Sequence, residues 1–500
     1  MGCCAPTLRP GVPPGLPVVS TAFSSVAKTT VGVGAPKDIQ FEGRLRGKLL
    51  IIAPKTRRAV AARSTMPSSD RCLMIAFGST MLSEDGYSVR VAMATKAVVA
   101  VQQGASPPPV LLGFEALRSL WKSQARKKAI ERIRSMGAVP LLVPVLPVRM
   151  PFSYRLNGLW TSLVVWVVCR SYGIGIVHAQ SHAAALAAAR ALARDRSRRM
   201  IFDVHGVDIE ERQLYGDLDA NSGEYHLRKR NERIAADRAD VIITVSQDLE
   251  RYVEGILDRG GHSSRARFEI VPCVLSFSAS PADVAVAREK ARQRLGLTTR
   301  PCVLYLGGSS GWQLPTETVA AFAALRRTTP SAFLLILTGD VEAFTALCRE
   351  AGIPADDFAI TSCPHREVAT VACAADAALL LRDDNLVNRV ASPTKFAEYL
   401  SMGVPVMITE VLGDFARIVR EFDVGAVVPA SNDAGLVAAG LRDLVLATEE
   451  ARAQRRERCI AACREVLSFE SILTTYRRIY RPDVADPTPS ARSSSEASSA

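Results

Sequence analysis

The stretch that decides the fold is SPTKFAEYLSMGVPVMIT, residues 392–409. Ser392 suits the N-cap of a helix, and Pro393 suits its first helical position. Gly403 suits the left-handed residue that follows a helix C-terminus. The run from Val404 to Thr409 has the apolar content of a buried strand. The stretch therefore predicts a helix of about ten residues that leads directly into a buried strand.

Two charged residues of that helix indicate a ligand. Lys395 lies in the first turn, where a cation opposes the helix macrodipole by ~0.3–1 kcal/mol unless an anion is bound there. Its position therefore predicts a phosphate. Glu398 lies three residues later on the same face and could accept hydrogen bonds from sugar hydroxyls. The alternative is an exposed Lys/Glu pair with no ligand.

The pattern SPxKxxEYxxxGxPV resembles the nucleotide-binding segment of the GT-B glycosyltransferases, especially the family 4-like group. The resemblance implies an α/β protein of two Rossmann-like doubly wound domains that face each other across a cleft. It implies that Glu398 holds the ribose of a sugar donor, with Ser392 and Lys395 in the same donor site. The group's fuller pattern has another glutamate eight residues earlier, where this chain has Val390.

Composition and charge describe an ordinary globular chain. It has 500 residues, 48% of them hydrophobic and 22% charged, which allows two or three domains. The net charge of +12 is concentrated in residues 1–66, where ten Lys and Arg face only Asp38 and Glu42. The remainder is nearly balanced, so we expect no nucleic-acid partner. Eleven cysteines without paired spacing favour reduced thiols in a cytosol.

The distribution of residue types along the chain predicts its domains. Residues 1–70 are rich in Pro, Gly, Ser and Arg and suggest disorder, an Arg-rich transit peptide, or an upstream start codon with the true start near Met66 or Met74. From Leu73 onward, short apolar runs alternate with amphipathic stretches, as in βαβ units. The expected parts are a leader (1–70), an N-terminal Rossmann-like acceptor domain (71–275), an interdomain connection (276–300), a C-terminal Rossmann-like nucleotide-sugar domain (301–450), one long crossing helix (451–480) and a disordered tail (481–500).

Thirteen apolar runs predict the strands of two sheets. The first series is Leu73–Phe77, Val110–Leu112, Val139–Val145, Gly175–His178, Met200–Val204, Val241–Val245 and Phe268–Val271. The second series is Cys302–Leu306, Phe333–Thr338, Phe358–Thr361, Ala377–Leu381, Val404–Thr409 and Ala426–Val428.

Three residues of the first domain are candidates for the acceptor side and for catalysis. His205, in FDVHGVDIEER, lies just past the carboxyl end of a predicted strand, where open α/β sheets bind ligands. This segment resembles the DxHGxxxEE segment of the family, which implies a catalytic role for His205; a buried structural histidine is the alternative. Gly86, in SEDGYSVR, resembles the family's acceptor-side loop. His178, in IVHAQSH, is a weaker acceptor-side candidate that a packing role would also explain.

The second domain begins with a small-residue turn, GGSSGWQLP, over residues 307–315. Gly307, Gly308 and Ser309 would let backbone N–H groups approach a phosphate before the next helix. In the resembled family this loop often holds an Arg and a Lys that grip the diphosphate. Small residues and Trp312 or Gln313 take those places here.

The diphosphate must therefore be neutralised by other cations. Lys395, Arg382 and Arg389 are available, and we place Arg382 with Lys395 in the donor site. Asp383 and Asp384 could hold a divalent ion, but adjacent acids in a loop are usually solvated, and the GT-B fold generally needs no metal. We expect no metal and no cofactor, only a nucleotide-sugar co-substrate.

The predicted function is transfer of a sugar from a nucleotide-sugar donor to a glycan, a lipid-linked or a small-molecule acceptor, in polysaccharide or glycolipid biosynthesis. The resemblance implies a retaining, metal-independent hexosyltransferase. A GT-B sugar-nucleotide epimerase and a catalytically silent nucleotide-sugar-binding protein of the same fold are the alternatives.

We expect a cytoplasmic location, with weak peripheral contact at the inner face of the membrane. No apolar run reaches the ~18 residues of a membrane span. The basic stretch from Lys122 to Arg134, with Trp121 at its edge, is the candidate for contact with anionic lipid. A solvated helix face is the alternative.

Overall fold

The computed structural model describes residues 70–78, 86–103, 106–146, 153–259, 266–276, 280–363, 365–430 and 433–481. The predictions for the leader, for the tail and for most of the loop before Gly86 lie outside these residues. No helix of the described residues is long and apolar enough to cross a membrane.

The N-terminal domain contains a parallel sheet of seven strands, in the order β3-β2-β1-β4-β5-β6-β7. Such an order arises when the chain winds outward from β1 in one direction and then returns to the centre to wind in the other. The strands are β1 (Cys72–Phe77), β2 (Val110–Ala116), β3 (Val139–Val145), β4 (Ile176–Gln180), β5 (Arg199–Asp203), β6 (Val241–Thr244) and β7 (Arg267–Ile270).

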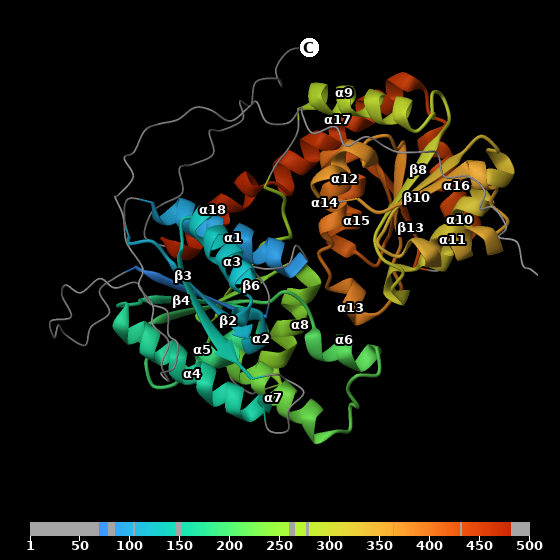
Figure 1. Ribbon diagram of the computed structural model, residues 1–500. Helices are drawn as coiled ribbons and strands as arrows, with labels where there is room; N and C mark the ends of the chain where they lie inside the picture. The colour runs from blue at the N-terminus through green and yellow to red at the C-terminus, as the bar shows by residue number, and fades with distance from the viewer. Residues whose placement is uncertain are drawn as a thin grey trace, which may run out of the picture. The chain divides into compact units, whose positions relative to one another are not determined.

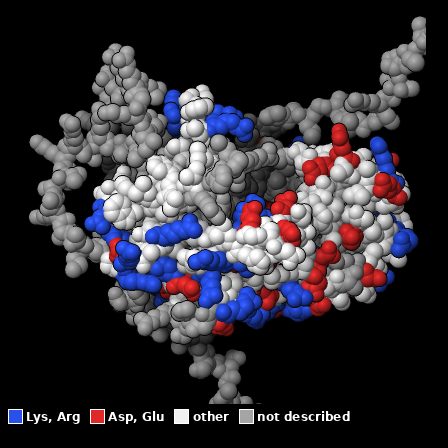
Figure 2. Space-filling view, turned by 90° about the horizontal axis from the view of Figure 1, so that it is seen from below, with Lys and Arg blue, Asp and Glu red and all other residues white. Residues whose placement is uncertain are grey.

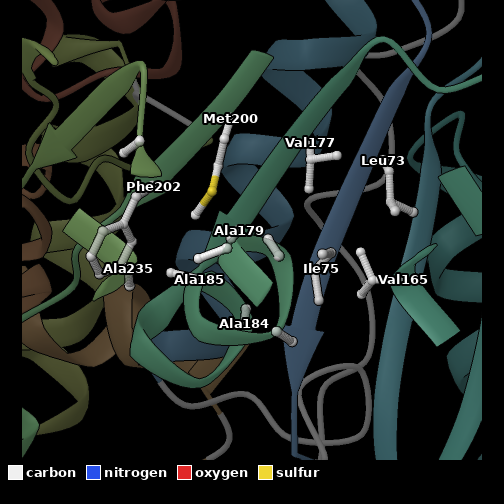
Figure 3. Packing of buried hydrophobic residues seen from close by; sticks show 14 of the residues in the cluster. Leu73, Ile75, Val165, Val177, Ala179, Ala184, Ala185, Met200, Phe202 and Ala235 are labelled. Atoms are coloured by element: carbon white, nitrogen blue, oxygen red, sulfur yellow. The ribbon is translucent and has the colours of Figure 1, made fainter. Parts of the chain in front are cut away.

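Helices cover both faces of this sheet, because successive residues of each strand point to opposite faces and both faces are apolar. One face packs against α4, α5, α7 and α8, and the other against α1 and α3. Figure 3 shows the first face, where strand side chains lie against Ala184 and Ala185 of α5. The helices are α1 (Gly86–Gln102), α2 (Leu117–Trp121), α3 (Ser123–Ser135), α4 (Ser153–Ser171), α5 (Ser181–Ala191), α6 (Asp208–Leu214), α7 (Gly223–Arg238) and α8 (Gln247–Asp258).

The C-terminal domain repeats this plan with six parallel strands, in the order β10-β9-β8-β11-β12-β13. Its strands are β8 (Cys302–Leu306), β9 (Phe333–Leu337), β10 (Phe358–Thr361), β11 (Ala377–Leu380), β12 (Val406–Thr409) and β13 (Gly425–Val428). All thirteen predicted strands are thus present in the described part of the chain, most with ends shifted by one or two residues.

The two faces of the second sheet are also covered. The helices α10, α11 and α16 pack on one face, and α9, α12, α14, α15 and α17 on the other. The helices are α9 (Pro281–Arg294), α10 (Pro315–Thr328), α11 (Val341–Glu350), α12 (His365–Ala372), α13 (Leu386–Arg389), α14 (Thr394–Ser401), α15 (Gly413–Phe422) and α16 (Ala434–Val445). Single 3-10 turns lie at Gly311–Gln313 and Ala355–Asp357.

The single crossing helix expected over 451–480 is instead two helices, α17 (Glu449–Val466) and α18 (Phe469–Tyr480). The break has a local cause, because Ser468 caps α18 by accepting a hydrogen bond from Ser471 N. Leu275 also bridges to Ser468 and donates its N–H to Leu467 O, which fixes the break. The helix α17 packs on the second sheet and α18 on the first, beside α1 (Figure 1).

The central helix, α14, begins one residue later than predicted. Its N-cap is Pro393 and not Ser392, whose hydroxyl accepts a hydrogen bond from Cys273 N at 2.8 Å. The distant backbone group competes successfully for this hydroxyl. The helix ends as predicted, with Gly403 at φ +68°, and a Cβ there would lie 3.3 Å from Arg456 O.

The two glycines Gly403 and Gly255 predict opposite effects of the same substitution. Gly403→Ala should lower the free energy of unfolding by ~1–2 kcal/mol, because a side chain is strained in the left-handed region. Gly255 lies inside α8 with nothing within 4 Å of where a Cβ would be, so Gly255→Ala should raise it by ~0.5–1 kcal/mol. Urea denaturation measures both. Equal effects of the two substitutions would contradict this account of the helix end.

Candidate functional site

The centre of the C-terminal sheet is a switch point, because the neighbours of β8 and β11 were added on opposite sides. Ligands of open α/β sheets bind at the carboxyl ends of such strands. Tyr399 of α14 is completely buried here. Its hydroxyl accepts from Leu306 N of β8 at 2.9 Å and donates to Leu379 O of β11 at 3.4 Å. The tyrosine therefore holds α14 against both central strands.

A pocket of about 300 Å³ lies at these strand ends. Its volume is at the lower end of the range for small-molecule sites. The predicted donor residues Lys395 and Glu398 line it together with the first residue of the β8–α10 loop, and the predicted acceptor-side residue Gly86 lines it too. Six of the lining residues are Gly86, Val89, Gly307, Thr338, Lys395 and Glu398.

Lys395 is the titratable cation of this pocket. Its Nζ donates a hydrogen bond to Gln313 Oε1. Burial, reinforced by the positive charge of Arg382, lowers the pKa of Lys395 to about 7, while Glu398 opposes the shift. Gly307 lies against the same two side chains, and at its φ of +148° an added Cβ would collide with Lys395 Nζ and Gln313 Oε1. Only glycine fits at this point of the loop.

A tryptophan holds the second cation. Arg382 follows β11 and is 2% exposed, and burial lowers the pKa of its guanidinium. Its Cζ lies 4.9 Å from the centroid of the Trp312 ring, and Lys395 Nζ lies 5.9 Å from the same centroid. Both cations are therefore within the range of a cation–π interaction with one indole. Two positive charges near one pocket favour an anionic ligand.

The small-residue loop has a different role at Ser309 from the one predicted. Asp340 accepts hydrogen bonds from Ser309 N at 2.7 Å and from Ser309 Oγ at 2.9 Å. These hydrogen bonds lower the pKa of Asp340. The carboxylate also lies 3.1 Å from where a Cβ of Gly308 would be. The Ser309 N–H is thus already paired in this structure, so Ser309 anchors the loop to α11, whereas Gly307 lies in the pocket.

The segment before α14 contacts the N-terminal domain. Val390 is 2% exposed and packs in the core of the first sheet, and its carbonyl accepts a hydrogen bond from Ser246 Oγ at 2.8 Å. This position corresponds to the additional glutamate of the family pattern, and an apolar contact fills it. Ser392, bonded to Cys273 N, belongs to the same junction. Ser392 therefore does not line the pocket, which corrects its placement in the donor site.

Asp384, which follows β11, belongs to an ordinary surface ion pair with Arg389. Asp384 accepts a hydrogen bond from Arg389 Nε at 2.5 Å, and both side chains are about half exposed. The helix α13 contacts α6, which places Arg389 apart from the pocket lining. Within the described residues there is no group of three or more His, Cys, Asp and Glu side chains that could hold a metal ion.

In the N-terminal domain, His205 follows β5 and its neighbour Asp203 is completely buried. Arg90 donates to Asp203 Oδ1 from Nη2 at 2.6 Å and from Nε at 3.2 Å. Burial alone would raise the pKa of Asp203, but the charge of Arg90 holds it well below its usual range. Burial lowers the pKa of His205 against the opposing effect of Asp203. Burial therefore favours the neutral form of His205.

A chain of hydrogen bonds fixes which nitrogen of His205 carries the proton. Gln180 Oε1 lies 2.9 Å from His205 Nε2, and an amide oxygen only accepts, so this orientation of the Gln180 amide assigns the proton to Nε2. Gln180 Nε2 donates to His178 Nε2 at 3.0 Å, so the proton of His178 is on Nδ1, 2.7 Å from the Tyr480 hydroxyl. His205 Nδ1 is left with a free lone pair and, among the described residues, no hydrogen-bond partner.

The same series of hydrogen bonds corrects the predicted acceptor-side role of His178. This side chain is 0% exposed, and Tyr480 of α18 and Gln180 bind its two nitrogens. Burial excludes direct contact with an acceptor, so His178 connects the last helix to His205. Gly86 begins α1 and lines the pocket, as a residue near bound substrates would.

Each domain has a non-glycine residue with a strained backbone conformation next to the candidate site residues. Leu314, between Trp312 and α10, has φ +53°, and Ser181, directly after Gln180, has φ +79°. Non-glycine residues in this region cost ~1–3 kcal/mol and cluster at functional sites. Sequence analysis missed the roles of Gln180, Tyr480 and Asp340, because each acts through a partner at least thirty residues away or on another element. The sequence held one indication of such roles: Gln180 and Asp203 are polar residues at the ends of strands.

Residues 108–273, which run from the start of β2 to the end of the first sheet, match the sequence profile of Glycosyltransferase Family 4. The two parallel sheets with helices on both faces agree with the fold that the motif around Glu398 implied. Over these residues the chain is similar to that glycosyltransferase family, and its fold is that of the GT-B glycosyltransferases. A comparison with curated proteins gave no match.

Solved structures of glycosyltransferases share the fold. A glycosyltransferase from Rickettsia africae is 14% identical, with a TM-score of 0.58 over 82% of this chain and 98% of that one. WaaG, a glycosyltransferase involved in lipopolysaccharide biosynthesis, is 13% identical, with a TM-score of 0.55 over 82% and 99%. An E. coli trehalose-6-phosphate protein bound with UDP-2-fluoro glucose is 12% identical, with a TM-score of 0.52 over 82% and 98%.

The predicted fold of two Rossmann-like doubly wound domains is confirmed. The roles of the individual site residues stay predictions. The geometry brings Gly86, Gly307, Lys395 and Glu398 to one pocket and places Arg382 beside it, next to Trp312. The other predicted site residues are not part of the pocket lining; these are His178, His205, Gly308, Ser309 and Ser392.

The chain of hydrogen bonds predicts that Tyr480 sets the protonation of His205. Tyr480→Phe removes the partner of His178 Nδ1, so the Gln180 amide loses its fixed orientation and His205 should become a mixture of both neutral forms. Tyr476→Phe removes a hydroxyl from a tyrosine of the same helix that is equally buried and stacks on Tyr480. It should leave His205 unchanged.

Nitrogen-15 NMR of histidine-labelled protein measures this directly, and the chain has only six histidines. The wild type and Tyr476→Phe should show His205 Nδ1 at the shift of an unprotonated nitrogen. An unchanged His205 spectrum in Tyr480→Phe would contradict the assignment.

Proposed function

We propose that this protein is a family 4-like glycosyltransferase that moves a sugar from a nucleotide-sugar donor to a hydroxyl of a glycan or lipid-linked acceptor. The observation that carries the proposal is the pocket at the carboxyl ends of β8 and β9, which joins Lys395, Glu398 and Gly307 to Gly86 of the first domain. The bound UDP-2-fluoro glucose of the E. coli structure supports a nucleotide sugar as the donor class.

In this proposal the donor's diphosphate lies at the N-terminus of α14, near Lys395 and Arg382, and its ribose hydroxyls bind Glu398. During transfer the bond between the sugar's anomeric carbon and the diphosphate oxygen breaks, the anomeric carbon bonds to the acceptor oxygen, and the proton of the acceptor hydroxyl passes to the leaving diphosphate. Negative charge develops on the leaving diphosphate, which the two cations and the helix N-terminus stabilise. No divalent ion is needed for this role.

His205 is the proposed group nearest to the reacting sugar. Because Gln180 binds Nε2–H, the ring offers Nδ1 as an acceptor. Nδ1 is buried in the free protein, so the proposal requires that donor binding exposes it before it accepts a hydrogen bond from a sugar hydroxyl. We further propose retention of the anomeric configuration, a role in polysaccharide or glycolipid assembly, and a cytoplasmic location; the lipopolysaccharide role of WaaG supports the pathway class.

A screen of nucleotide sugars tests the function. The purified protein is incubated with each sugar nucleotide, with and without EDTA, and free nucleoside diphosphate is measured. Release of diphosphate from one donor class, undiminished by EDTA, is expected. Conversion to another sugar nucleotide without release would identify an epimerase, and binding without either reaction would identify a binding protein. Both results would contradict the proposal.

Lys395 predicts that donor affinity depends on pH. A diphosphate favours the charged form, and the pKa of Lys395 is about 7 in the free protein. Below this pH the cation is already present; above it, binding must take up a proton, and affinity should fall by up to about tenfold per pH unit. Lys395→Arg keeps the charge at every pH and should flatten the profile. Calorimetry with UDP and GDP from about pH 6 to about pH 9 measures it.

An equally steep profile in Lys395→Arg would show that another group titrates. The bare nucleosides uridine and guanosine, which carry no phosphate, serve as ligand controls and should show no such pH dependence.

If Glu398 binds the ribose, its substitution should weaken the binding of ligands that contain a ribose. Glu398→Gln removes a charged acceptor, which should weaken nucleoside diphosphate binding by roughly 1.5–3 kcal/mol with an unchanged melting temperature. Glu410→Gln, at an exposed glutamate outside the pocket lining, is the matched control and should have no effect. Unchanged nucleotide affinity in Glu398→Gln would refute the ribose assignment.

A further inference from the structure

The helix α4 has an exposed apolar stripe on the side opposite its core contacts. Val164, Val165 and Val168 pack into the core of the first sheet. Large apolar residues three or four positions apart lie on the other side, so they form one continuous stripe. Their exposed fractions are 52% for Leu156, 69% for Leu159, 52% for Leu163, 46% for Trp166 and 39% for Val167. Single exposed leucines are ordinary, but a stripe of this kind marks a contact surface.

The segment of the chain that contains this stripe carries charge of one sign. Residues 132–194, which include all of α4 and α5, contain no Asp or Glu and seven Arg. Arg170 is exposed at the end of α4, with its Cζ 5.2 Å from the centroid of the Trp166 ring. Arg190 of α5 lies across α4, with Nη1 2.7 Å from where a Cβ of Gly158 would be. Figure 2 shows the lower side of the view in Figure 1, where Lys and Arg side chains are numerous and are interspersed with Asp and Glu.

We propose that α4 docks the protein on an anionic lipid surface. An interfacial helix has an apolar face of Leu and Trp with Arg beside it, and anionic headgroups supply the opposite charge that this region of the chain lacks. A second copy fits less well, because a symmetric contact would bring the same arginines together with no carboxylate from residues 132–194 to pair with them. This inference rests on the proposed function, in which the acceptor is lipid-linked. A lipid-linked acceptor lies in a bilayer, so docking on the bilayer would bring the enzyme to it.

This surface differs from the basic helix that the sequence favours. The helix α3 carries exposed Lys127 and Lys128, but it also carries exposed Glu131, and its apolar residues Ala129 and Ile133 are buried. Trp121, 74% exposed, is a single aromatic at its start. The helix α3 thus has charge without an apolar stripe, and α4 has both.

Co-sedimentation of the full-length protein with vesicles tests the proposal. The vesicles are phosphatidylcholine alone or phosphatidylcholine mixed with phosphatidylglycerol, at low and at high salt. The wild type should bind the mixed vesicles and be partly released by salt. The double variant Leu159→Gln/Leu163→Gln should bind about tenfold more weakly or less. Its matched control is Leu436→Gln/Leu446→Gln, which changes two leucines of 52% and 53% exposure in the other domain and should bind as the wild type does.

Four results would overturn the proposal: no binding by the wild type, equal binding to neutral vesicles, undiminished binding by the α4 variant, or loss of binding only in Arg126→Gln/Lys127→Gln/Lys128→Gln of α3. Light scattering without lipid tests whether α4 instead binds a second copy of the chain. Wild-type dimers that dissociate in the α4 variant would show that it does. Release of nucleoside diphosphate is measured in parallel. Full release by a wild type that binds no vesicles would refute the docking surface and leave the proposed transfer reaction intact.

Discussion

The structure of the donor pocket depends on one buried hydroxyl. Tyr399 joins Leu306 at the end of β8 to Leu379 in β11, where the two central strands of the second sheet diverge. Without it, a backbone N–H would be buried unpaired at the centre of the sheet, at a cost of ~1–3 kcal/mol. Because α14 is short, this anchor also determines where its first turn lies. Lys395 and Glu398, four residues and one residue before Tyr399, are thereby held at the strand ends.

The positive charge of the pocket comes from outside the loop between β8 and α10, which has no Lys or Arg of its own. Trp312 and Gln313 lie where the family pattern often has an Arg and a Lys, and they contact the cations that come from β11 and α14 instead. An indole face and an amide oxygen attract a cation without neutralising it. Arg382 and Lys395 thus remain close enough for the charge of one to lower the pKa of the other. An anion bound between them would relieve that repulsion.

Much of this arrangement was predictable from the sequence, because it rests on local patterns. The apolar runs predicted every strand of both sheets, and Gly403 predicted the end of α14 from the left-handed conformation it adopts. The pocket positions of Lys395, Glu398 and Gly307 followed from their places at a helix start and a strand end.

The errors all involve partners that are distant in the sequence. Ser392 has the right residue type and spacing for a helix cap, but Cys273 N, 119 residues away, binds its hydroxyl. His178 follows the pattern of a site histidine, but Tyr480 is its partner across 302 residues. The expected single C-terminal helix ends at a bridge between Ser468 and Leu275. Local propensity contains no information about such contacts, which exist only after the two sheets have formed.

The most direct test of the account is an experimental structure of the protein with the nucleoside diphosphate that it binds best. The account predicts the diphosphate at the N-terminus of α14 with Lys395 and Arg382 as its cations, the ribose on Glu398, and no metal ion bridging the phosphates. A nucleotide bound elsewhere, or one whose phosphates contact neither Lys395 nor Arg382, would contradict it.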